Sequence, residues 1–244
     1  FSAVAAGVRY ANRTDVMLVR LAPGTAVAGA FTRSSTRAAC ILDCQAKLAG
    51  KPVTDAGAAI VVNSGNSNAF TGAAGQAAVD AITGQVAEAL GLPASRVFSS
   101  STGVIGEPLP HDRITAKVPD LVATLSPGGI ADAARAIMTT DTFPKAATRT
   151  ALIGGVEVTI SGIAKGSGMI APDMATMLCF LATDAKVPAA ALQKILSKGS
   201  DRSFNCVTVD SDTSTSDTVL LFATGSAKHP RVPAEGGAIL RDFA

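Results

Sequence analysis

Apolar residues along this chain fall into short runs, which are separated by clusters of glycine, proline and small polar residues. Runs of this length bounded by turn residues are typical of buried strands. They lie at residues 16–21, 25–32, 58–62, 97–101, 177–182 and 219–223. A further stretch, 151–164, predicts a hairpin with Gly154 and Gly155 at its turn.

Helices are predicted where apolar residues recur at three- and four-residue steps. The clearest case is 73–90, which Gly91 ends and Pro93 prevents from continuing. Shorter helices are expected at 130–138 and 189–196. This mixture predicts an α/β (α+β) fold in which helices pack on sheets as layers, with no linker dividing the chain.

Composition narrows the class of protein. Hydrophobic residues make up 48% of the 244 residues and charged residues only 16%, so much of the chain is expected to be buried. A net charge of +2, scattered along the sequence, gives no reason to expect nucleic acid as a partner. The four cysteines lack zinc-type spacing, and Cys40 and Cys44 lie far in sequence from His111 and His229. We therefore expect no metal site, free thiols, a reducing cytoplasmic setting and, for want of a long apolar segment, no membrane span.

The segment 165–179 carries the most distinctive chemistry, because glycines and Pro172 exclude an ordinary helix before the apolar run 177–182 begins. Thr176 stands at this junction, between Ala175 and Met177. A threonine here can simply cap a strand. If the peptide bond before it were cut, however, its own amine could serve as the base for its hydroxyl, whose oxygen could then attack a carbonyl.

Three other segments combine groups that could bind or activate a substrate, and each has a plainer interpretation. Thr102 and Gly103 could direct a hydroxyl and a backbone N–H at one spot, as an oxyanion hole requires, or form a glycine turn. Residues 138–145 could hold an amino-acid substrate, or simply end a helix in a polar turn. Residues 210–217 form a polar loop that could line the site, and Lys165 could bind a carboxylate or lie in solvent.

Taken together, these segments resemble the bifunctional ornithine acetyltransferase (glutamate N-acetyltransferase) family. The segments that carry the resemblance share their order with the family and span nearly the whole chain. They are 62–69, 101–106, 138–145, 165–178 and 205–210. Family members continue for well over a hundred residues beyond the part matched here, so we expect the C-terminal part of the pattern to be absent from this sequence.

The resemblance implies a precursor that cleaves itself between Ala175 and Thr176 into segments 1–175 and 176–244, which stay together as a dimer of cleaved pairs. It implies a layered α/β sandwich like that of N-terminal-nucleophile hydrolases. Thr176 would take acetyl from N-acetylornithine and pass it to glutamate without a cofactor, although acetyl-CoA is a possible alternative donor. It places the oxyanion hole at Thr102 and Gly103, and substrate contacts at Thr139, Lys165 and Thr176.

Two other functions remain open at this point. The same self-cleaved threonine could serve an amidase or aminopeptidase, which differs in admitting water to the acyl-enzyme. Alternatively, the chain could be an inactive, uncleaved scaffold.

Overall fold

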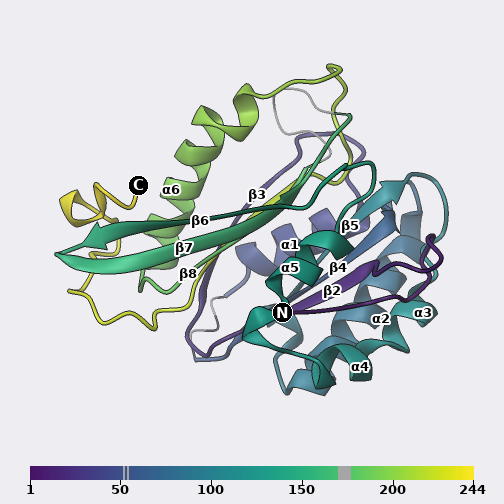
Figure 1. The fold of residues 1–244 in the computed structure, drawn as a ribbon, viewed down its shortest axis with the longest axis horizontal. Coiled ribbons are helices and arrows are strands. Elements are labelled where there is room, and N and C mark those ends of the chain that lie inside the picture. Colours follow the sequence, from purple (N-terminus) through teal and green to yellow (C-terminus); the bar gives the residue numbers. More distant parts are fainter. Residues whose placement is uncertain (52, 54, 170–176) are drawn as a thin grey trace.

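The computed structural model of the chain describes residues 1–51, 53, 55–169 and 177–244 (Figure 1). Within these residues the strands form two sheets, in the orders β1-β2-β4-β5 and β3-β9-β8-β7-β6. The strands are β1 (Ser2–Val4), β2 (Val16–Leu21), β3 (Ala26–Phe31), β4 (Ala58–Asn66), β5 (Val97–Val104), β6 (Lys145–Ile153), β7 (Val156–Lys165), β8 (Leu178–Thr183) and β9 (Thr218–Ala223).

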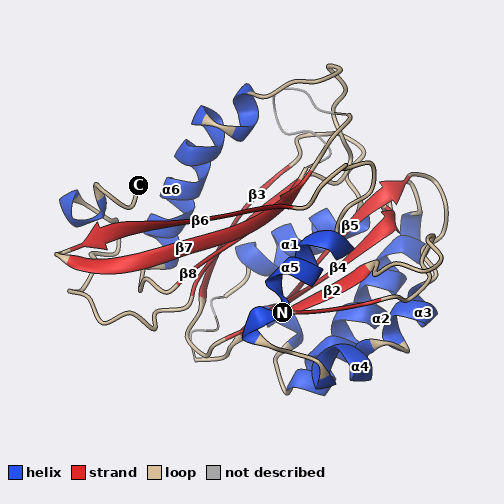
Figure 2. Cartoon of the chain, in the orientation of Figure 1, coloured by secondary structure: helices blue, strands red, loops and turns tan. Residues whose placement is uncertain are grey.

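Helices cover both outer faces of this pair of sheets (Figure 2). The helices of the chain are α1 (Ala39–Ala49), α2 (Gly72–Leu90), α3 (His111–Thr115), α4 (Val118–Ala123), α5 (Ile130–Ala136) and α6 (Ala189–Arg202), with short 3-10 turns at Ala94–Arg96, Pro127–Gly129, Phe204–Cys206 and Ala238–Leu240. Apolar residues of α2, α3 and α4 pack on the four-stranded sheet, and those of α6 pack on the five-stranded sheet. The fold is therefore a layered α/β sandwich, as predicted.

The central core lies between the two sheets. It joins inward-facing residues of β2, β4 and β5 to those of β7, β8 and β9, with buried residues of α1 and α5 at its margins. Phe98 of β5 and Phe222 of β9 meet edge to face across it, with ring centroids 6.4 Å apart. Because aromatic rings bury large apolar areas, this pair is a major contact between the sheets.

Two strand pairs run parallel, and each connection between their strands contains a helix. β4 connects to β5 through α2, and β8 connects to β9 through α6, as parallel neighbours require. Parallel pairing brings the carboxyl ends of β4 and β5 to one edge of their sheet, whereas β8 and β9 begin together. The site described below lies at these ends.

The predicted helices and strands are confirmed, but several of their predicted first or last residues were wrong. The predicted loop at 63–69 is strand as far as Asn66, and β5 continues through the predicted loop residues Thr102 and Gly103. Polar residues can extend these strands because their side chains find partners inside the protein. The Oγ of Ser101 donates to Oδ1 of Asn63 at 2.7 Å, and the Oγ of Ser64 donates to the carbonyl of Ala136 at 2.7 Å.

Other differences concern elements whose local pattern is weak. β6 begins at Lys145, six residues before the predicted hairpin, and α6 continues to Arg202. Helix α1 was not predicted, because only Cys40, Ile41 and Cys44 of its residues are buried. No helix in the described part of the chain has the length and apolar character needed to span a membrane.

Candidate active site

The carboxyl end of β5 places Thr102 and Gly103 next to the backbone of β4. Thr102 is fully buried. Gly103 has φ +132°, and a Cβ atom added to it would lie 2.3 Å from the carbonyl carbon of Gly65 and 2.6 Å from the amide nitrogen of Asn66. Only glycine fits both this backbone conformation and this close approach. The strand ends therefore meet as a tight backbone junction.

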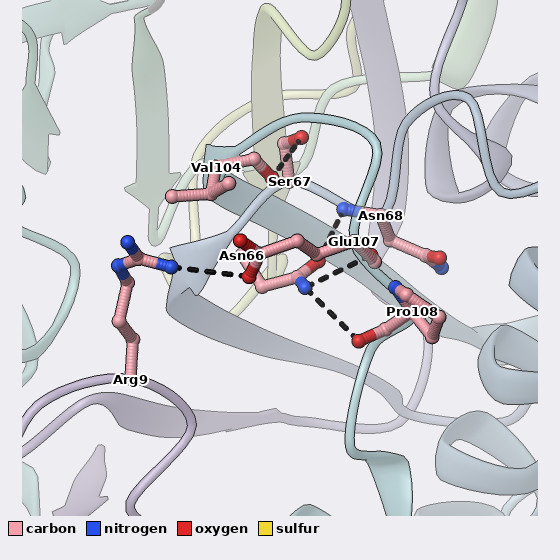
Figure 3. A network of polar contacts seen from close by, with 7 residues as sticks. All are labelled: Arg9, Asn66, Ser67, Asn68, Val104, Glu107 and Pro108. Carbon is pink, nitrogen blue, oxygen red and sulfur yellow. Dashed lines mark hydrogen bonds and ion pairs between the residues drawn. The ribbon is translucent and has the colours of Figure 1, made fainter.

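Side-chain hydrogen bonds hold the segment after Gly103 against the end of β4 (Figure 3). The Nδ2 of Asn66 donates to the carbonyls of Glu107 and Pro108, at 3.1 and 3.2 Å. The Oγ of Ser67 donates to the carbonyl of Val104 at 2.8 Å. Because these side chains bond to backbone carbonyls, they fix the path of the chain that follows Gly103.

Lys165, the last residue of β7, brings a cation to Thr102. Its side chain is only 2% exposed, and its Nζ donates to the Thr102 Oγ1 at 3.1 Å. Burial lowers the pKa of Lys165 to about 8, against the opposing charges of Asp141 and Asp217, while the nearby charge of Lys145 lowers it further. A lysine held in this way remains a hydrogen-bond donor but loses its proton more readily than usual.

Asp141 connects the segment before β6 to the end of β7. Its Oδ1 accepts hydrogen bonds from the Nζ of Lys145 at 2.5 Å and from the amide of Gly166 at 2.8 Å. Its Oδ2 accepts from the amide of Thr139 at 3.3 Å. Burial alone would raise the pKa of Asp141, but these three donors and the charge of Lys165 keep it below its usual value. The ionised carboxylate of Asp141 thus lies between Thr139, Lys145 and the backbone that follows Lys165.

Asp217 lies immediately before β9 and is fully buried. Its Oδ1 accepts a hydrogen bond from the amide of Met177 at 2.9 Å. The strand register explains this contact, since Lys165 lies opposite Leu178 and Leu178 lies opposite Thr218. Burial raises the pKa of Asp217 to about 7, while the Met177 amide, the Ser214 hydroxyl and the charge of Lys165 oppose the rise.

The structure brings together three of the residues predicted to form the site, namely Thr102, Gly103 and Lys165. Thr139 lies on the other side of Asp141 from Lys165. Ala175 and Thr176 fall outside the described residues, but Met177, the residue that follows them, is held by Asp217. This arrangement offers a hydroxyl and a buried cation, which suit a developing oxyanion.

The sequence did not single out Asp141 or Asp217. It pointed only to the polar segments 138–145 and 210–217 that contain them. One feature of the sequence could have identified Asp217, because it is an acidic residue directly before an apolar strand. Such a residue lies where its strand begins, beside the beginning of the neighbouring strand.

Among the residues that the structure describes, no three His, Cys, Asp or Glu side chains gather as a metal site would require. A cavity of about 750 Å³ opens at the opposite ends of the strands, near Ala26 and Arg96, and shares no residue with this site.

Comparisons with known proteins agree on one family. The model of the ArgJ family matches residues 1–242. An arginine biosynthesis bifunctional protein ArgJ from Ruegeria pomeroyi is 63% identical over 237 residues, which are 97% of this chain and 57% of that protein. The chain thus spans little more than half the length of the curated relatives it matches.

Solved structures extend the comparison to the fold. Ornithine acetyltransferase from Mycobacterium tuberculosis, complexed with ornithine, is 34% identical with a TM-score of 0.55, covering 70% of this chain and 89% of that one. The L-aminopeptidase D-Ala-esterase/amidase of Ochrobactrum anthropi, a variant of the Ntn-hydrolase fold, has a TM-score of 0.52 at 13% identity, covering 98% and 74%. The second likeness concerns the fold alone.

Proposed function

Because the chain belongs to the ArgJ family, we propose that it carries the acyl-transfer centre of an enzyme of arginine biosynthesis, which moves acetyl from N-acetylornithine to glutamate. One observation carries this proposal beyond the family match. Lys165 and Thr102 are buried in contact, and Asp217 holds Met177, the residue that follows the predicted nucleophile. This cluster of charged groups next to Met177 supports the proposal of acyl transfer at Thr176.

The first step is cleavage between Ala175 and Thr176. The hydroxyl of Thr176 attacks the carbonyl of Ala175, the peptide nitrogen leaves as an amine, and water then hydrolyses the resulting ester. The products are segments 1–175 and 176–244. The five-stranded sheet supports their continued association, since β3, β6 and β7 precede the cut, whereas β8 and β9 follow it. Six residue pairs join β7 to β8.

In the transfer cycle, the freed amine of Thr176 takes the proton of its own hydroxyl, and the oxygen attacks the acetyl carbonyl of N-acetylornithine. Thr102 and Gly103 stabilise the oxyanion, and ornithine leaves as an amine after its nitrogen takes that proton from the Thr176 amine. The amine of glutamate then attacks the acetyl ester and returns the oxygen to Thr176. Thr139 and Lys165 contact the substrate, and Lys165 suits a carboxylate because it is a buried cation.

No cofactor is needed for this cycle, because the acetyl group arrives as an amide and leaves as an amide; acetyl-CoA is a possible alternative donor. The proposal also includes a cytoplasmic location and assembly as a dimer of cleaved pairs, which the family resemblance supports. These features are independent of the chemistry at Thr176 and are tested separately, by fractionation and by light scattering.

A Thr176→Ala variant of the natural-length gene product tests the proposal. Denaturing mass analysis should find two fragments meeting at 175/176 in the wild type and one uncleaved species in the variant. Acetyl transfer from N-acetylornithine to glutamate should disappear with cleavage. Thr150→Ala, which alters an exposed threonine of β6, is the control and should behave as the wild type.

The same assay separates the two rival functions. An amidase would release acetate from N-acetylornithine at equal rates with and without glutamate, whereas a transferase makes N-acetylglutamate only when glutamate is present. An inactive scaffold would give a single uncleaved wild-type species. A Thr176→Ala protein that still exchanged acetyl groups would end the proposal.

A further inference from the structure

Asp141 ties the segment that follows α5 to the end of β7. Its side chain is fully buried, and three donors reach it: the amide of Thr139 at 3.3 Å, the Nζ of Lys145 at 2.5 Å and the amide of Gly166 at 2.8 Å. The Gly166 amide belongs to the peptide group that begins at Lys165. One carboxylate therefore fixes the separation between the backbones of Thr139 and Lys165, the two substrate contacts of the proposed function.

Asp141 also supplies negative charge to Lys165. Burial lowers the pKa of Lys165 to about 8, and the charges of Asp141 and, to a smaller extent, Asp217 oppose this change. The two acids differ in how firmly they keep their charge, because burial raises the pKa of Asp217 to about 7. Burial acts in the same direction on Asp141, but its three donors and the charge of Lys165 hold its pKa below the usual value. Of these two acids, Asp141 is the one that stays ionised throughout the neutral range.

The other charged groups close to the end of β7 come from β6 and α5. Lys145, the first residue of β6, lowers the pKa of Lys165 further by repulsion between like charges, and about a third of its own side chain is exposed. Helix α5 also packs on β7, but its Asp132 and Arg135 are exposed and pair with each other at 2.9 Å. Among the groups that keep their charge near pH 7, Lys165 thus faces Asp141, which favours its protonated form, and Lys145, which opposes it.

We propose that Asp141 is a positioning residue for substrate binding, which holds Thr139 and Lys165 at a fixed separation and keeps Lys165 positively charged for a substrate carboxylate. This inference rests on the proposed function and adds a residue to which the resemblance gives no role. Asp141 acts through its neighbours, because its side chain is buried and protein donors occupy both its oxygens. N-acetylornithine and glutamate each carry an α-carboxylate, so both halves of the cycle need the cation.

Three variants separate the charge of Asp141 from its shape. In Asp141→Asn an oxygen can still accept a backbone amide, but the negative charge is lost, whereas Asp141→Glu keeps the charge on a longer side chain. Lys145→Gln removes the opposing cation at a partly exposed position. Asp43→Asn is the matched control, because Asp43 is also mostly buried and pairs with a lysine four residues later, Lys47, at 2.7 Å. Lys47 lines the cavity at the opposite ends of the strands.

The natural-length gene product is assayed for cleavage at 175/176 and for kcat, KM and the pH profile of kcat/KM with both substrates. Asp141→Asn should fold and cleave, yet its alkaline limb should move to lower pH by roughly one unit, because Lys165 loses the charge that favours its proton. At pH 8 its KM should rise roughly fivefold while kcat changes by less than about threefold, since the loss is in substrate binding. Substrate ionisation is the same for every variant, so the shift belongs to the enzyme.

The other variants should behave differently. Asp141→Glu should keep the alkaline limb of the wild type, because the negative charge is retained. Lys145→Gln should move the limb in the opposite direction, to higher pH, because the repulsion of Lys165 is removed. Asp43→Asn should change neither KM nor the pH profile.

Four results would overturn the inference. The first is an Asp141→Asn enzyme with the alkaline limb of the wild type, and the second is an equal shift in Asp141→Glu, which would make shape and not charge the cause. The third is failure of the folded Asp141→Asn protein to cleave, since Asp141 would then act before substrate binds. The fourth is a Lys145→Gln limb that stays in place or moves to lower pH, and this variant decides the question if Asp141→Asn does not fold. A wild type that neither cleaves nor transfers would instead overturn the proposed function.

Discussion

Replacing Gly103 with alanine should break the junction between β4 and β5. The new Cβ would lie 2.3 Å from the carbonyl carbon of Gly65, a backbone atom that cannot move without shifting the strand. The φ of +132° adds a conformational cost of roughly 1–3 kcal/mol for any other residue. Overpacking against the backbone adds roughly 1–3 kcal/mol more. Together they predict a loss of roughly 2–6 kcal/mol in the free energy of unfolding.

Gly91→Ala is the control, because Gly91 also has a positive φ, +63°, but a Cβ there would meet nothing within 4 Å. Its cost should be only about 1–2 kcal/mol. Urea unfolding followed by circular dichroism gives both values, and a difference of about 2 kcal/mol separates the midpoints by roughly 1 M. Equal midpoints for the two variants would refute the steric reasoning.

The other predictions concern the core and the buried charges. Phe98→Ala, at 1% exposure between the sheets, should cost roughly 3–5 kcal/mol in thermal or urea unfolding; Phe70→Ala, at 66% exposure, should cost less than about 0.5 kcal/mol. Asp217 has its pKa raised to about 7 by burial, so only the folded state binds its proton between about pH 4 and 7. The stability of the wild type relative to Asp217→Asn should therefore fall by roughly 2–4 kcal/mol as pH rises through that range; a flat difference would contradict the raised pKa.

The layered fold could be predicted because its strands and long helix have clear patterns. The strand at 16–21 is buried at five of its six positions, and α2 ends at Gly91 with φ +63°, as a glycine cap requires. The strand ends could not be predicted in the same way. Asn63 favours a loop by propensity, but it is buried and its Oδ1 accepts a hydrogen bond from the Ser101 hydroxyl at 2.7 Å. Contacts between residues 38 positions apart leave no local signal.

The residues of the candidate site differ in the same way, because only some of them stand out in the sequence. Thr102, Gly103 and Lys165 stand out in the sequence through their glycine-rich surroundings and the family resemblance. Asp217 does not, because its role depends on the register that places β8 beside β9 and brings its carboxylate to Met177. The pairing of Lys165 with Thr102 likewise joins residues 63 positions apart, from different sheets. The sequence thus predicts a reactive threonine, whereas the groups around it depend on the fold.

Stability and activity should oppose each other at this site. Burial disfavours the charged forms of both Lys165 and Asp217, lowering one pKa to about 8 and raising the other to about 7. A fold selected for stability alone would replace such groups with apolar or amide side chains of similar size. Asp217→Asn should accordingly be more stable than the wild type at about pH 8 and less active. Activity is the measurement that distinguishes a carboxylate that serves the reaction from one that merely pairs two strands, since removing a purely structural carboxylate would change stability and leave the chemistry of intact molecules unchanged.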